Sequence, residues 1–311
     1  MDYALYLIAP LMGFAGMMSG GYWGVGCGWI VVPTMLILGF DTFSAIGIGL
    51  LQMLPPTILT VYRQYPEIGW KRGEPGRTLA LPIAAGAFLT SLAGKSVNTV
   101  LIGLWGAETI QWLIIALILF LIFQTLCSKT ACYGDALPEI GPRKSGIAFG
   151  TGLLTGLVSS MLGVGGGILV RPLLTSGFRM PEYYTSRIVR FLLLVTTGTG
   201  GLTYLFHSGG IDWHVLWISM LVAFGGMFGF PVGVRMHTIV YDGGYAQHIH
   251  KSFGFMGFAV LTNTILNMAG LEMFSRFLML ALGFLLCVYL FLFTLYTKKH
   301  PRETAGTGGV H

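Results

Sequence analysis

Two glycine clusters that begin 139 residues apart are the strongest sign of a binding site in this sequence. The first reads GVGCG over 24–28 and precedes four apolar residues and Pro33; the second reads GVGGG over 163–167 and precedes Ile-Leu-Val-Arg and Pro172. Glycine inside a helix costs about 1 kcal/mol relative to alanine, so both clusters predict breaks in apolar helices. A helix that restarts after a break presents unpaired N–H groups, which bind anions. The alternative is that these glycines allow tight helix packing.

Three arginines that fall inside apolar segments are the candidate cationic ligands. Arg171 follows the second cluster, and Arg187 and Arg190 are three residues apart, so these two share a helix face. A charged side chain within a membrane segment is costly unless it is paired or hydrated, and therefore marks a functional site by default. The planar guanidinium group fits the oxygens of sulfite or a sulfonate. Alternatively, Arg187 and Arg190 reach the lipid headgroups, and Arg171 pairs with carboxylates of the 128–144 segment.

Neutral side chains near these features are candidate hydrogen-bond partners for an anion. Gln52 and the threonines Thr196 and Thr197 can donate to an oxyanion, although threonine also donates to its own helix. Cys27 suggests a sulfur-transfer role, but the favoured interpretation is a packed small residue. The candidate substrate-binding residues are therefore Gly26, Cys27, Gly28, Gln52, Gly165, Gly166, Gly167, Arg171, Arg187, Arg190, Thr196 and Thr197.

The composition indicates an integral membrane protein. Of the 311 residues, 54% are hydrophobic and only 10% are charged, whereas soluble domains contain about 25% charged residues. The net charge of +6 comes from basic residues scattered among loops, which argues for membrane orientation and against nucleic acid as a partner. The four cysteines form no metal-binding spacing, and no catalytic motif is present. We therefore expect no enzyme activity, no cofactor and no metal, and a lipid bilayer as the surroundings.

The long apolar runs predict an all-α membrane fold, because about 20 apolar residues cross the hydrocarbon layer as a helix. Each glycine cluster lies between two of these helices. The expected helices lie near residues 3–19, 26–39, 43–62, 78–94, 107–127, 145–162, 165–177, 185–206, 215–234, 253–269 and 274–296.

The distribution of positive charge indicates how the chain crosses the membrane. If the chain folds back as a hairpin at each glycine cluster, thirteen loop lysines and arginines share one side, and only Lys95 and Arg276 face the other. If each cluster lies within a single crossing, the bias disappears. Because positive loops stay in the cytoplasm, the hairpin arrangement is favoured. It predicts an external N-terminus and a cytoplasmic C-terminus.

Each half then contains five segments, and an odd number turns the second half upside down relative to the first. The sequence therefore predicts two inverted-topology repeats, each with a glycine-broken hairpin, plus one extra C-terminal helix. Aligning the halves with one deletion places Gly49 opposite Arg187 and Gln52 opposite Arg190, so the site is expected to be cationic on one side and neutral on the other. The expected divisions are 1–127 for the first repeat, 128–144 for a cytoplasmic linker, 145–269 for the second repeat and 270–311 for the extra helix and tail.

The doubled motif, GVGCGWIVVP over 24–33 and GVGGGILVRP over 163–172, resembles the sulfite exporter TauE/SafE family. The glycine pairs 86/94 and 225/233 also fit, and the resemblance covers roughly residues 5–295. It implies a carrier of sulfite, sulfoacetate or related anions. Cys27 departs from the glycine of the family motif, and Arg171 stands where the first half has Val32. Both departures bear on the choice of substrate.

We therefore expect a multi-pass transporter in the cytoplasmic (inner) membrane that exports sulfite or an organosulfonate. The alternatives are import of thiosulfate or a related anion, a Cys27-dependent membrane sulfur-transfer protein, and a sensor or scaffold. Nothing in the sequence indicates an oligomer. Acidic and histidine residues fall at the ends of segments or in loops, whereas proton-coupled carriers place such residues within the membrane. Export driven by the membrane potential alone is therefore expected.

Overall fold

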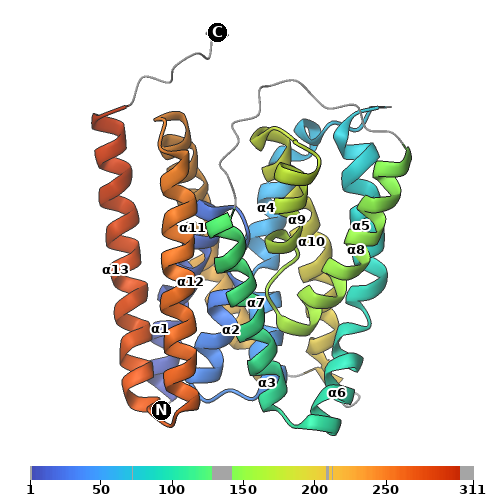
Figure 1. The fold of residues 1–311 in the computed structure, drawn as a ribbon. Helices are drawn as coiled ribbons and strands as arrows, with labels where there is room; N and C mark the ends of the chain where they lie inside the picture. Colours follow the sequence, from blue (N-terminus) through green and yellow to red (C-terminus); the bar gives the residue numbers. More distant parts are fainter. Residues whose placement is uncertain (1, 72, 128–141, 208–209, 212, 302–311) are drawn as a thin grey trace.

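The computed structural model describes residues 2–71, 73–127, 142–207, 210–211 and 213–301, and nearly all of them are helical (Figure 1). The expected all-helical class is confirmed. A two-residue antiparallel pairing of β1 (Phe206–His207) with β2 (Gly210–Ile211) is a small addition. The segments 128–141 and 302–311, which belong to the expected linker and tail, lie outside the described residues.

The helices follow the expected order. In the first half they are α1 (Asp2–Trp23), α2 (Gly28–Ile37), α3 (Thr42–Leu51), α4 (Leu54–Gln64), η1 (Tyr65–Ile68), η2 (Gly76–Ala80), α5 (Leu81–Ser91), α6 (Gly94–Trp105) and α7 (Glu108–Cys127). The remaining helices are α8 (Pro142–Leu162), α9 (Gly167–Pro172), η3 (Leu173–Gly177), α10 (Glu182–Leu205), α11 (Trp213–Asp242), α12 (Ala246–Met268) and α13 (Glu272–Lys299).

Several described helices can cross a bilayer by their length and apolar composition. Five do so individually, and a sixth crossing results if the bent pair Gly76–Ser91 and Gly94–Trp105, with an angle of 44°, counts as one. The individual spans are Thr42–Ile68, Lys144–Leu162, Glu182–Leu205, Trp213–Asp242 and Glu272–Lys299. These spans support a multi-pass membrane protein.

Both glycine clusters break a helix in the same way. Helix α1 ends at Trp23 before α2 begins at Gly28, and α8 ends at Leu162 before α9 begins at Gly167. Gly24 and Gly163, the first residues of the two loops, have φ angles of +67° and +70°. These values lie in the left-handed region that glycine enters without a steric penalty. The third residues, Gly26 and Gly165, repeat the pattern at +84° and +76°.

Several helices differ from the expected ones, and α6 was not expected at all. The expected helix 43–62 is interrupted at Gln52 and Met53, just before two prolines that lack backbone N–H groups. Lys95 lies within α6 rather than in a loop. Helix α11 continues to Asp242, so His237 is a buried helical residue and not part of a cytoplasmic loop.

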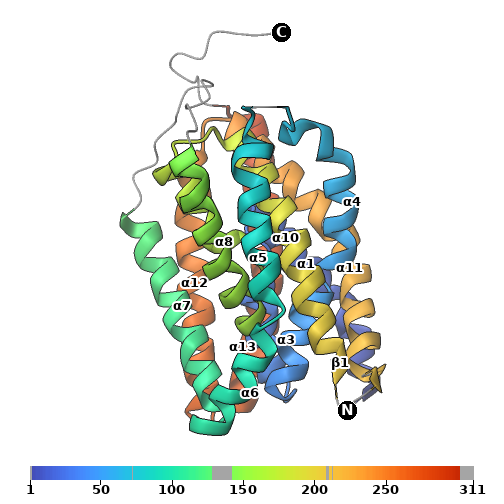
Figure 2. The ribbon, with the colours of Figure 1, turned by 90° about the vertical axis from the view of Figure 1, so that its right-hand side faces the viewer.

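The first helix of each half packs against a helix of the other half (Figures 1 and 2). Helix α1 runs parallel to α11, and α8 runs parallel to α5. A Cβ on Gly225 would overlap the carbonyl oxygen of Pro10, and a Cβ on Gly86 would overlap that of Phe149. The two contacts correspond at an interval of 139 positions, since Phe149 stands 139 positions after Pro10 and Gly225 stands 139 positions after Gly86. Glycine is needed at these positions because the backbones touch.

The hairpin of the first half returns to the end where α1 begins. Phe40, just after α2, stacks on His214 at the start of α11 with ring centroids 5.9 Å apart. Because α1 and α11 run parallel, the start of α11 also marks the start of α1. Helices α1 and α2 therefore enter and leave the fold at the same end, and the loop of 24–27 forms the turn.

The expected alignment of the two halves is wrong in one detail. The residues that precede α3 and α10 are Asp41 and Pro181, which are 140 positions apart. The second half therefore has one residue more between its loop and its next helix, where one fewer was expected. Gln52 then corresponds to Leu192 and not to Arg190.

Candidate functional site

The two glycine loops touch each other in the protein interior. A Cβ on Gly28 would overlap the carbonyl oxygen of Gly163, and a Cβ on Gly167 would stand 3.2 Å from the carbonyl oxygen of Val25. The residues of both loops are buried. The structure thus brings together the two helix breaks that the sequence predicts. Gly28 and Gly167 allow the two backbones to pack closely there.

Two apolar side chains cover the third glycine of each loop. A Cβ on Gly26 would lie 3.0 Å from Leu193 Cδ2 and 3.4 Å from Met53 Sδ, and a Cβ on Gly165 would meet the same two side chains at 2.6 and 3.3 Å. Leu193 and Met53 come from α10 and from the break after α3. They occupy the space from which a ligand would approach both loops, so this conformation is closed at the loops.

The second loop is held by a threonine of α10. The N–H of Gly166 donates to Thr196 Oγ1 at 3.2 Å, and the Thr196 hydroxyl donates to Leu192 O at 3.1 Å. Thr197 donates to Leu193 O at 2.7 Å, so its hydroxyl is used within its own helix. Thr196 therefore positions the loop, and Thr197 follows the alternative expected for helical threonines.

The first loop packs its thiol among neutral groups. Cys27 Sγ lies 3.0 Å from Met17 Sδ and accepts a hydrogen bond from Gln52 Nε2 at 2.9 Å. Cys27 and Gln52 are both fully buried, and Gln52 Oε1 has no partner among the described residues. These contacts fit a packed thiol.

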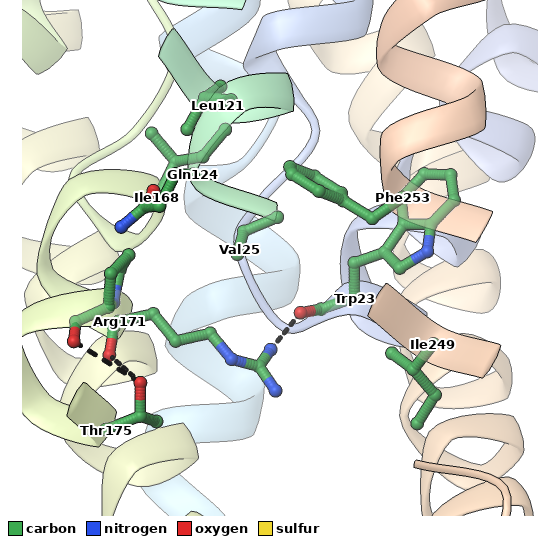
Figure 3. Close-up of a pocket in the computed structure, with 10 residues that line it drawn as sticks. Trp23, Val25, Leu121, Gln124, Ile168, Arg171, Thr175, Ile249 and Phe253 are labelled. Atoms are coloured by element: carbon green, nitrogen blue, oxygen red, sulfur yellow. Dashed lines mark hydrogen bonds between the residues drawn. The ribbon is translucent and has the colours of Figure 1, made fainter. Parts of the chain in front are cut away.

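Arg171 joins the second hairpin to the end of α1. Its Nη1 donates to the carbonyl oxygen of Trp23 (Figure 3). Its Nη2 lies 2.6 Å from Glu182 Oε1. His237 contacts Tyr22 O at 2.6 Å through Nδ1 and stands 3.8 Å from Glu182 Oε1 through Nε2. Glu182 is therefore a partner of Arg171 from outside the expected 128–144 segment, and residues 128–141 of that segment lie outside the described residues.

A small cavity lies beside Arg171, between the end of α1 and helices α7, α9 and α12 (Figure 3). Its volume of about 80 Å³ exceeds the roughly 10–15 Å³ that one water needs. The cavity therefore has room for several water-sized groups beside Val25 of the first loop and Ile168 at the start of α9. Its lining residues are Trp23, Val25, Leu121, Gln124, Ile168, Arg171, Pro172, Thr175, Ile249 and Phe253.

Arg187 and Arg190 differ in how their charges are balanced. Arg187 Nε donates to Glu67 Oε2 at 2.7 Å, and its guanidinium lies over the Tyr183 ring at 3.4 Å from the centroid. Arg190 is only 5% exposed, and Nη1 donates to the neutral Gln64 Oε1 at 2.8 Å. Among the described residues, Nε of Arg190 has no partner and no carboxylate lies within 4 Å of its guanidinium. Arg190 is thus a buried cation that makes no direct salt bridge with any described residue.

Two hydroxyl residues of the site were missed by sequence reasoning. Thr155 and Ser159 lie on α8, directly before the second loop, and both side chains are fully buried. Their hydroxyl oxygens have no hydrogen-bond partner among the described residues. The signal in the sequence is their spacing of four residues, which places them on one helix face.

Long apolar helices, a pair of broken helices in contact and a buried unpaired cation define a membrane transporter for a small ligand. The chain belongs to the sulfite exporter TauE/SafE family, whose model matches residues 9–264. It is also similar to a "probable membrane transporter protein" of Methanocaldococcus jannaschii, with 22% identity over 291 residues that cover 88% of this chain and 98% of the relative. No solved structure matches the chain.

Proposed function

We propose that this transporter exports a small sulfur-containing anion, sulfite or an organosulfonate such as sulfoacetate, across the cytoplasmic (inner) membrane. The family name supports the substrate class. The observation that carries the proposal is Arg190, a buried guanidinium that has a neutral glutamine as its partner and no described carboxylate within 4 Å. A buried cation that makes no direct salt bridge attracts an anion, because the low-dielectric surroundings screen its charge weakly. The anion thus supplies the missing charge.

Helix α10 carries several of the proposed ligands, in order along the proposed path of the anion. Arg187 and Arg190 precede Leu193, which faces both glycine loops, and Thr196 follows one turn later. We propose that the arginines collect the anion on the cytoplasmic side and pass it to Gly26, Cys27 and Gly28 of one loop and Gly165, Gly166 and Gly167 of the other. Gln52, Arg171 and Thr197 belong to the surrounding shell. Leu193 and Met53 must move aside for passage, so they act as the gate.

The proposed mechanism is alternating access between two inverted repeats, 1–127 and 145–269, with α13 as the extra helix. Support comes from the matching φ angles of the two loops and from the α1–α11 and α5–α8 contacts, whose residues recur at an interval of 139. Helices related in this way rock against each other around a central site in repeated transporters. The pseudosymmetric contacts therefore give the two halves equivalent surfaces on which to move.

The orientation that we propose can be tested by cysteine labelling. We expect Asp2→Cys to react with an impermeant thiol reagent outside the cell and Lys299→Cys to react only after the membrane is opened, because the positive loops stay in the cytoplasm. In Figure 1, α13 ends at the opposite end of the molecule from the start of α1. Cysteine-free protein is the background, with all four native cysteines replaced. Labelling of both positions from the same side would contradict the orientation.

The proposed function is tested by transport in proteoliposomes with sulfite, sulfoacetate, thiosulfate and sulfate offered separately. We expect flux of sulfite or sulfoacetate that exceeds flux of sulfate. The second candidate, uptake of thiosulfate, is favoured if thiosulfate is the best substrate and accumulates in the direction opposite to export. A Cys27→Ala variant separates transport from sulfur transfer: we expect it to keep its flux, because the loop offers the anion its backbone N–H groups, while the Cys27 thiol makes only neutral packing contacts. Absence of flux with every anion would refute the proposal.

A further inference from the structure

The hydroxyls of Thr155 and Ser159 are exceptions among the buried helical hydroxyls of this protein. Most threonines and serines in its helices donate to the carbonyl oxygen one turn earlier, as Thr151 does to Ile147 O at 2.9 Å and Ser160 does to Gly156 O at 2.8 Å on the same helix. The hydroxyls of Thr155 and Ser159 make no hydrogen bond with any described residue, although both side chains are fully buried. A buried hydroxyl without a partner destabilises the fold, so such groups call for a functional explanation.

These two hydroxyl residues lie at the second glycine loop. Thr155 Cγ2 is 2.9 Å from the position that a Cβ on Gly166 would take, and Ser159 accepts the N–H of Gly163 with its carbonyl oxygen at 2.9 Å. Their spacing of four residues places both side chains on the same face of α8. Thr196, which binds the N–H of Gly166, approaches the same loop from α10. The side chains of Thr155 and Thr196 therefore reach one loop from two helices, and Ser159 lies one turn nearer to that loop on α8.

The first loop has no equivalent of this pair. The positions 139 residues before Thr155 and Ser159 are Gly16 and Gly20, which have no side chain to donate a hydrogen bond. A Cβ on Gly20 would stand 2.8 Å from the carbonyl carbon of Gly26, so a serine side chain does not fit there without a shift of the loop. The two loops share a backbone conformation but differ in hydrogen-bonding capacity.

We propose that Thr155 and Ser159 form a seat for the oxygens of the transported anion at the second loop alone. The two hydroxyls donate to a sulfite or sulfonate head group once Leu193 and Met53 have moved aside. A hydroxyl pair is neutral, so it holds the anion weakly enough to release it after Arg190 has attracted it. The seat rests on the proposed function for the identity of its ligand. It makes the site asymmetric, with the donors in the second half of the chain.

The seat is tested by measuring both binding and transport of sulfite with matched variants. We expect Thr155→Val and Ser159→Ala each to raise the Kd, measured by titration calorimetry in detergent, and the KM for flux by about tenfold, which corresponds to one hydrogen bond to a charged group. Thr155→Ser, which keeps the hydroxyl, stays within about threefold of wild type. The control is Thr151→Val on the same helix, whose hydroxyl is exposed and satisfied by its own helix.

Each outcome of these measurements bears on the seat. Wild-type Kd and KM in both single variants would overturn it, as would equal losses in Thr155→Ser and Thr155→Val. Binding by the wild type without flux, together with weaker binding by the variants, would support the seat and refute the proposed function. Wild-type protein that binds neither sulfite nor sulfoacetate would overturn both. Elution of every variant at the same volume as the wild type from a sizing column excludes misfolding. Thr155→Ser is the variant that disturbs the packing least.

Discussion

Replacing Arg190 with glutamine is expected to lower sulfite transport by about a hundredfold. The glutamine keeps a hydrogen-bonding side chain beside Gln64 but removes the unpaired positive charge. Hydrogen bonds to buried charges contribute about 1.5–3 kcal/mol, and 2.8 kcal/mol is about a hundredfold in affinity. The loss should be in KM as well as in rate, since the charge acts on the anion before and during passage. Initial rates of sulfite flux in proteoliposomes over a range of concentrations measure both.

Two further variants identify the charge as the cause. Arg190→Lys keeps a cation and should retain more flux than Arg190→Gln, although it loses the planar fork. Arg187→Gln removes a charge that Glu67 already neutralises, so it should have a smaller effect. Wild-type flux in Arg190→Gln, or equal losses in the two glutamine variants, would show that Arg190 does not bind the substrate.

Replacing Gly28 with alanine is expected to abolish transport. The added Cβ would overlap the carbonyl oxygen of Gly163, which belongs to the backbone of the other loop and does not turn away as a side chain would. The two loops must therefore separate, and overpacking of this kind costs about 1–3 kcal/mol. Sulfite flux and the thermal unfolding temperature in detergent are the measurements, and both should fall.

Gly150→Ala is the matched control for Gly28→Ala. Gly150 lies on α8 and has no heavy atom within 4 Å of an added Cβ, so alanine should improve helix stability by about 0.5–1 kcal/mol and leave flux unchanged. If Gly28→Ala transports sulfite as well as Gly150→Ala does, close contact between the loops is not required for transport.

The helices and their breaks could be predicted because both depend on local sequence. Apolar runs of about 20 residues specify crossings in any surroundings, and the clusters at 24–28 and 163–167 need the left-handed φ values that glycine tolerates. The break at Gln52 escaped detection, although Pro55 and Pro56 follow it. Prolines at the start of a helix and prolines that interrupt one look alike until the preceding turn is known.

The balance of charge in the site could not be predicted, because the partners are distant in sequence. Glu67 stands 120 positions before Arg187, and Tyr22 stands 215 positions before His237. Only the fold shows that Arg187 is neutralised while Arg190 is not. The contact of Leu193 and Met53 with the glycine loops could not be predicted for the same reason, since leucine and methionine are common throughout apolar segments. The candidate arginines were therefore found by type, and their roles were separated by geometry.

The proposed energetics of export depend on whether titratable residues lie near the glycine loops. His237 and Glu182 lie 3.8 Å apart beside Arg171, so titratable groups are present near the loops after all. Glu182 Oε1 lies 2.6 Å from Arg171 Nη2, so this carboxylate is the direct counter-ion of Arg171. We therefore keep electrogenic export as the proposal, and proton coupling through this pair is the competing mode.

Sulfite flux into proteoliposomes under an imposed membrane potential at equal pH tests the central claim most directly. An anion gains about 2.3 kcal/mol per charge per 100 mV, or about fiftyfold in gradient for one charge. The proposal predicts that sulfite accumulates in the positive compartment and that Arg190→Gln removes this accumulation. Flux that ignores the potential and follows an imposed pH difference, or no sulfite flux at all, would contradict electrogenic anion export by this protein.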